Sequence, residues 1–142
     1  MHFVFNDGGR KDAGYKGFTR DCVVRSIAII TGKPYQEVYD AINVLSESER
    51  FHNKKQKKSS ARDGVHRRTY QKYLLSLGYK WYPTMHVGSG CKVHLKKDEL
   101  PAGKLVVRLS RHLTAVIDGV VHDIGTCDRD GTRCVYGYFK KD

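Results

Sequence analysis

The sequence has 142 residues with no long hydrophobic run, only three prolines and few acidic residues. No apolar stretch approaches the roughly 20 residues that a membrane-spanning helix needs, so we expect no membrane contact. The apolar segment at the N-terminus is too short for a secretory signal, and this predicts a cytoplasmic protein. With 39% hydrophobic and 29% charged residues, the composition is typical of a globular chain, and the length fits one domain over residues 1–142.

The chain also lacks the close cysteine pairs of a zinc site or of a dense disulfide framework. Its four cysteines stand at positions 22, 91, 127 and 134, with no CxxC pair. In a reducing compartment such cysteines stay reduced, so we expect four free thiols. Cys127 and Cys134 enclose two aspartates, but structural zinc usually requires a second close pair of ligands. We therefore predict no metal site and no cofactor.

Acidic residues are scarce, because 15 Asp and Glu stand against 26 Lys and Arg, giving a net charge of +11. Residues 50–72 hold nine of the basic residues and one acid. Within them, residues 50–62 have no apolar periodicity and are predicted to form an exposed loop. The candidate basic patch consists of Lys54, Lys55, Lys57, Lys58, Arg67 and Arg68. This charge suits nucleic-acid phosphates, an acidic protein or peptide, or simple solvation, and the charge alone does not choose among them.

Apolar spacing predicts helices in the first half of the chain. Asp21 is placed to cap a first helix, which is apolar around most of its surface and should end at Gly32. Pro34 suits the first turn of a second helix. Asp63 is placed to cap a third helix, which should end at Gly78.

From residue 79 onward the pattern changes to short segments rich in β-branched and aromatic residues, separated by Gly, Pro and Asp. These segments are YKWYPTM, KLVVRLS, HLTAVI, VVHDI and RCVYGYF. Helices followed by strands indicate an α+β fold, in which an N-terminal helical part packs on a C-terminal antiparallel β-sheet.

Two of these strands form a predicted hairpin that contains a histidine and an aspartate. Asp118-Gly119 between alternating strands is typical of a two-residue turn, which places Thr114 opposite Asp123. His112 shares a face with Thr114 and is thus a diagonal neighbour of Asp123, within side-chain reach. An acid in this position can orient an imidazole, although many such pairs are only surface ion pairs.

The stretch TRDCVVRSIAIITG places Cys22 in the first turn of the first helix. The positive end of the helix dipole and the unpaired backbone N–H groups there both favour a thiolate. With His112 alongside, Cys22 would have a base that can also protonate a leaving group, and Asp123 would hold that base. The alternative is that Cys22 is only a small buried residue.

The order of Cys, His and Asp, with the cysteine on an N-terminal helix, resembles the papain-like cysteine peptidase superfamily. The segments DCVVRSIAIITGKPYQEVYDAI and RLSRHLTAVIDGVVHD are similar to small single-domain members from bacteria and their phages. The resemblance covers residues 6–45 and 103–139. It implies a papain-like domain in the bacterial cytoplasm, with Cys22 as nucleophile, His112 as general base and acid, and Asp123 as the orienting residue.

One part of the family pattern is missing, because papain-like peptidases usually carry a glutamine shortly before the cysteine as an oxyanion donor. Here the first glutamine is Gln36. The backbone N–H of Cys22 can contribute, and Asn6 or Thr19 are the candidate substitutes for the missing amide.

Two functions follow as hypotheses. The first is a cysteine peptidase or related thiol acyl-transfer enzyme, which acts on a peptide or isopeptide bond of a protein or peptide substrate, with an acidic substrate as one option. The alternative is a non-catalytic nucleic-acid- or protein-binding module on the same scaffold, which uses residues 50–72. Nucleic acid is the less favoured partner, and the sequence leaves the oligomeric state open.

Overall fold

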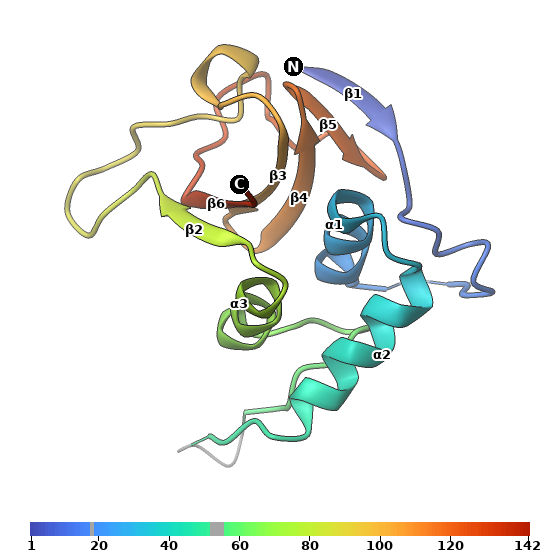
Figure 1. Ribbon diagram of the computed structural model, residues 1–142. Coiled ribbons are helices and arrows are strands. Elements are labelled where there is room, and N and C mark those ends of the chain that lie inside the picture. The colour runs from blue at the N-terminus through green and yellow to red at the C-terminus, as the bar shows by residue number, and fades with distance from the viewer. Residues whose placement is uncertain (18, 52–55) are drawn as a thin grey trace.

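The computed structural model describes residues 1–17, 19–51 and 56–142, and within them three α-helices pack against a six-stranded sheet (Figure 1). The helices are α1 (Cys22–Thr31), α2 (Tyr35–Ser46) and α3 (Arg67–Ser76), and a short 3₁₀ helix, η1, covers Lys97–Glu99. The strands are β1 (His2–Phe5), β2 (Lys80–Pro83), β3 (Lys104–Leu109), β4 (His112–Ile117), β5 (Val120–Asp123) and β6 (Gly137–Lys140). The predicted α+β class, with helices before most of the strands, is confirmed.

The sheet has the order β1-β5-β4-β3-β6-β2 and is mixed. Five of its strands pair antiparallel, as predicted, but β1 lies parallel to β5 at one edge. The prediction of a purely antiparallel sheet is therefore wrong. Residues His2–Phe5 escaped the prediction because four residues with three consecutive apolar side chains show no alternation, and an edge strand has only one neighbour to specify it.

The helix α1 begins and ends where the sequence predicts. Gly32 adopts the left-handed conformation with φ 74°, and its N–H donates to the carbonyl of Ala28 at 3.0 Å. Asp21 occupies the N-cap position, but its carboxylate makes no hydrogen bond to the first turn. The predicted N-cap position of Asp21 is therefore confirmed, but its carboxylate points into a buried polar network described below and not to the first backbone N–H groups.

The third helix begins later than predicted. Its N-cap is His66, not Asp63. Ser60 and Gly64 exchange two backbone hydrogen bonds, of 2.8 and 3.0 Å, and these close a turn over the residues where the helix was expected to start. A local turn thus competes with the helix for the same residues.

Apolar side chains fill both faces of the sheet. On one face, α1 packs on β4, and the buried side chains include Val24, Ile27, Leu113, Ala115 and Phe139. On the other face, the long segment between β2 and β3, yellow to orange in Figure 1, contributes Leu95 and Leu100 to a second buried cluster with Leu105, Val107 and Val116. The position of α1 on the sheet is therefore fixed by burial along most of its length.

The hairpin of β4 and β5 has the predicted register. Ala115 lies opposite His122, and Ile117 lies opposite Val120. Both turn residues have positive φ, 47° at Asp118 and 77° at Gly119, as the predicted turn type requires. This register places the beginning of β4 beside the end of β5, where the candidate His and Asp stand.

The prediction of four free thiols is wrong. Cys91 and Cys134 form a disulfide across 43 residues, whereas Cys22 and Cys127 are free. Such a long-range pair leaves no local spacing signal in the sequence. Cysteine usage therefore no longer supports a reducing compartment. Among the described residues, no helix is long and apolar enough to cross a membrane.

Candidate active site

The fold brings three predicted site residues to one place. Cys22 is the first residue of α1, His112 is the first of β4, and Asp123 is the last of β5. Because α1 packs across β4 and β4 pairs with β5, the start of the helix meets one end of the hairpin. Cys22 and His112 line the same cleft, whose volume is about 590 Å³.

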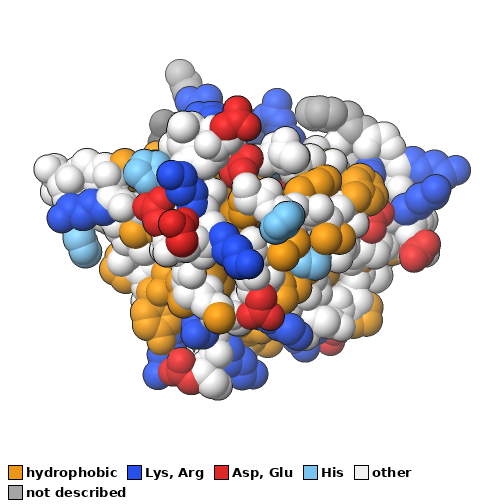
Figure 2. Space-filling model, turned by 90° about the horizontal axis from the view of Figure 1, so that it is seen from above, with side chains coloured by type: hydrophobic (Ala, Val, Ile, Leu, Met, Phe, Trp, Pro, Cys, Tyr) orange, Lys and Arg blue, Asp and Glu red, His pale blue; other side chains and the backbone are white. Residues whose placement is uncertain are grey.

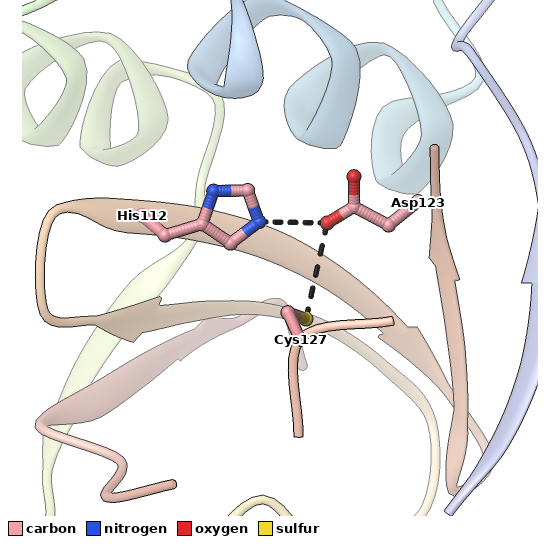
Figure 3. Close-up of side chains that lie close together, drawn as sticks. All are labelled: His112, Asp123 and Cys127. Carbon is pink, nitrogen blue, oxygen red and sulfur yellow. Dashed lines mark hydrogen bonds and ion pairs between the residues drawn. The ribbon is translucent and has the colours of Figure 1, made fainter. Parts of the chain in front are cut away.

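His112 and Asp123 form a direct hydrogen bond, with 2.7 Å between Nε2 and Oδ2 (Figure 3). Thr114 donates its hydroxyl to the same oxygen at 2.7 Å, and the N–H of Ile124 donates to Oδ1 at 2.7 Å. Burial alone raises the pKa of Asp123, but these hydrogen bonds outweigh it and hold the pKa below its usual range. An ionised carboxylate accepts only, so Nε2 carries the proton and Nδ1 is left for another partner.

The thiol of Cys22 is the candidate partner, because it lines the same cleft as His112 and each of the two groups shifts the pKa of the other. Burial by itself raises the pKa of Cys22, but the hydrogen bond and charge of His112 lower it more, and the N–H of Leu113 and the charge of Arg25 add to them. The net result is a pKa below the ordinary range of cysteine. His112 therefore has a proton acceptor on one nitrogen and shares its cleft with a thiol whose pKa is lowered.

The pKa of the His112 imidazole shifts in the opposite direction. Burial lowers the pKa of His112, but the hydrogen bond to Asp123 and the neighbouring thiols of Cys127 and Cys22 outweigh it and raise the pKa to about 11. A lowered pKa on the thiol and a raised pKa on the imidazole both favour the thiolate–imidazolium pair.

Arg25 contacts the acidic residues next to the site. Although charged, it is buried, and its guanidinium forms an ion pair with Asp21 and lies 3.5 Å from Oδ1 of Asp123. Asp21 is fully buried and also accepts hydrogen bonds from the hydroxyls of Tyr35, at 2.6 Å, and Thr19, at 2.8 Å. Sequence reasoning missed this network, although an acid and an arginine four residues apart in an apolar helix were its signal.

The two candidate oxyanion side chains lie outside the cleft. Oδ1 of Asn6 accepts the N–H of Gly8 at 2.8 Å, and the hydroxyl of Thr19 donates to Asp21. Neither residue lines the cleft. Tyr70 lines the cleft and is buried. Burial is the main effect that raises the pKa of its phenol, and the negative charge of a Cys22 thiolate raises this pKa further. The hydroxyl of Tyr70 is a candidate donor beside the N–H of Cys22, and sequence reasoning did not name it.

A second thiol, that of Cys127, lies next to Asp123. Sγ of Cys127 is 4.0 Å from Oδ2 of Asp123 (Figure 3), and the ligand atoms of His112, Asp123 and Cys127 lie within 4.8 Å of one another. These are ligand types of zinc, but the oxygen that would bind a cation already accepts two hydrogen bonds, and Arg25 faces the other oxygen. The arrangement fits a hydrogen-bonded triad better. Cys134, being in a disulfide, offers no thiolate.

The described residues of the candidate basic patch border different hollows. Lys54 and Lys55 lie outside the described residues. Lys57 and Lys58 border a hollow of about 470 Å³ that adjoins the cleft of Cys22 along residues 63–65, and Arg68 borders another one beside α2. Of the four described members only Arg67 lines the cleft of Cys22. The face shown in Figure 2 mixes basic, acidic and hydrophobic side chains, so the excess of positive charge forms no uniform surface there.

Comparison of the chain with protein-family models, with curated proteins and with solved structures gives no match. The papain-like resemblance therefore stays a prediction, and the function is argued from the site itself.

Proposed function

We propose that the protein is a cysteine peptidase or a related thiol acyl-transfer enzyme with Cys22, His112 and Asp123 as its triad. One observation carries the proposal: a thiol with a lowered pKa lies beside an imidazole whose far nitrogen is hydrogen-bonded to a buried carboxylate, in an open cleft. A scaffold of the papain-like type is proposed with it. Its support is the nucleophile at the start of a buried helix and the base and acid on the adjoining strands.

In the first half of the reaction, the Cys22 thiolate attacks the carbonyl carbon of a peptide or isopeptide bond, and a C–S bond forms. The negative charge that develops on the carbonyl oxygen needs donors, and the N–H of Cys22 and the hydroxyl of Tyr70 are the candidates. The His112 imidazolium gives its proton to the leaving amine as the C–N bond breaks, and a thioester on Cys22 remains.

In the second half, neutral His112 takes a proton from water or from an acceptor amine, which attacks the thioester. The C–S bond breaks and the thiolate is restored, with a carboxylic acid as the product of hydrolysis or an amide as the product of transfer. Asp123 keeps the imidazole in one orientation and stabilises its charged form in both halves.

The experiment is acylation by p-nitrophenyl acetate, followed by release of p-nitrophenol and by peptide mapping of the acylated residue. We expect a burst of about one equivalent with the acetyl group on Cys22. The burst should be absent in Cys22→Ala and slowed at least about 100-fold in His112→Ala.

Cys127→Ala shows which free thiol is acylated, because Cys127 contacts Asp123 and His112 but does not line the cleft of Cys22. We expect it to retain the burst. Acylation on Cys127 instead of Cys22, or a burst on Cys22 of the same rate in His112→Ala, would overturn the proposal.

A further inference from the structure

Arginine is distributed unevenly in this protein. The sequence contains 11 arginines and 15 lysines. Two hollows flank His112, the cleft of Cys22 and a second hollow of about 620 Å³ that contains Cys127. Seven arginines line these two hollows, and none of the described lysines does. Arg20, Arg67, Arg108 and Arg111 line the first, and Arg25, Arg111, Arg129 and Arg133 line the second.

The two hollows meet at the candidate catalytic histidine, because Arg111 and His112 border both of them. An extended ligand that enters one hollow can therefore continue past His112 into the other. Arg111 is exposed and has a φ of 55°, a left-handed conformation unusual for a residue with a side chain. It stands at the junction, directly before the histidine.

Most of this positive charge has no acidic partner. Arg25 is paired with Asp21 and Asp123, whereas the other six arginines form no ion pair with a described residue. The acidic residues that border the hollows are Asp63 and Asp123, and the second is engaged by His112. The charge around the site is therefore available to a ligand.

Two of the guanidinium groups are held in place by aromatic rings. Arg67 lies over Trp81 and Arg108 lies over Tyr136, each 5.2 Å from the ring centroid. Stacking restricts the orientation of a guanidinium, and its planar fork matches a carboxylate in two parallel hydrogen bonds, which an ammonium group does not. The preference for arginine at this site thus points to planar or tetrahedral oxyanions, carboxylates or phosphates.

We propose that the substrate of this site is an acidic peptide, which lies across His112 with its carboxylates against the arginines of the two hollows. The inference rests on the proposed function and names its substrate class. A peptide is favoured over a nucleic acid because the cleft places a thiol beside the arginines, and a thiolate of this type attacks acyl groups. Val23, Val65 and Leu113 add apolar wall to the cleft, which suits a peptide backbone better than a row of phosphates.

The test is protection of Cys22 from iodoacetamide by ten-residue peptides, followed by mass spectrometry. One peptide alternates Glu and Ala, and its control alternates Gln and Ala. We expect the Glu peptide to protect Cys22 at a concentration at least about tenfold lower than the Gln peptide, and added salt to reduce this difference.

Arg67→Gln and Arg129→Gln alter one exposed arginine in each hollow. Each should weaken protection by the Glu peptide about fivefold, the upper range for an exposed ion pair. Arg68→Gln is the matched control, because Arg68 neighbours Arg67 on α3 but borders a different hollow, and it should change nothing.

Labelling without peptide separates this inference from the proposed function. Slow labelling that does not depend on His112 would refute the function. Fast labelling with equal protection by the two peptides, or with no protection by either, would overturn the acidic-peptide inference alone. Stronger protection by a single-stranded oligonucleotide of equal charge at physiological salt would also overturn it, in favour of nucleic acid.

Discussion

Nε2 of His112 lies 2.7 Å from Oδ2 of Asp123, although 11 positions separate the two residues in the sequence. A two-residue turn brings them together, and the hydroxyl of Thr114 and the N–H of Ile124 hold the carboxylate in place. Since this bond occupies one nitrogen of the imidazole, the other nitrogen is left for the thiol of Cys22, which lines the same cleft. The geometry of a short hairpin thus determines which atom of His112 acts as the base.

Replacing Tyr70 by Phe removes one hydroxyl from the cleft and little volume. We expect the rate of Cys22 acylation by p-nitrophenyl acetate to fall about 100-fold, because one donor to the developing oxyanion is lost. The pH dependence of Cys22 alkylation should change little. Tyr73→Phe is the control, since Tyr73 is buried on the same helix and does not border the cleft. Equal acylation rates in the two variants would exclude Tyr70 as a donor.

Replacing Asp21 by Ala breaks the buried network beneath the site. The change leaves the guanidinium of Arg25 buried with Asp123 as its remaining acidic neighbour. We expect the free energy of unfolding to fall by about 3 to 5 kcal/mol in urea titrations, the usual cost of removing one member of a buried ion pair. Asp40→Ala, on the exposed face of α2, should change it by less than about 0.5 kcal/mol. Similar decreases in the free energy of unfolding in both variants would show that the network does not stabilise the fold.

The disulfide between Cys91 and Cys134 predicts a thiol count. Denatured protein should show two reactive thiols before reduction and four after it. Cys91→Ser should lower the free energy of unfolding by about 2 to 4 kcal/mol, because the link closes a long loop in the unfolded chain. Four thiols in the protein before reduction, when it is isolated without reductant, would contradict the pairing.

The sequence was most informative where local rules decide the structure. Gly32 ends α1 because its left-handed conformation is easily reached, and Asp118-Gly119 sets the register of the hairpin. From these two signals the positions of Cys22, His112 and Asp123 in their elements follow. The hairpin register also predicts that His112 and Asp123 meet, but that Cys22 joins them is an inference from the family resemblance, because spacing along the chain says nothing of how a helix packs on a sheet.

The features that sequence reasoning missed depend on distant parts of the chain. In the sequence Arg25 looks like an ordinary polar residue of a helix, because its partner Asp123 belongs to the distant strand β5. Cys91 is paired with Cys134 through the course of the long segment between β2 and β3. The strand β1 is specified by the edge of β5 rather than by its own four residues. The arginines around His112 come from α1, α3, β3 and the segments between elements, so no single stretch reveals them.

The central claim is that Cys22 and His112 form an activated pair, and the rate of Cys22 alkylation by iodoacetamide against pH tests it most directly. An ordinary thiol has a pKa of about 8.5, and alkylation reports the thiolate. Since the pKa of Cys22 is lowered and that of His112 is raised, the thiolate should persist from below neutral pH upward. We expect fast labelling below pH 7 in the wild type. In His112→Ala the midpoint should move above about 8.5, because burial then acts without the imidazole. The same midpoint in both proteins, at or above about 8.5, would contradict the account.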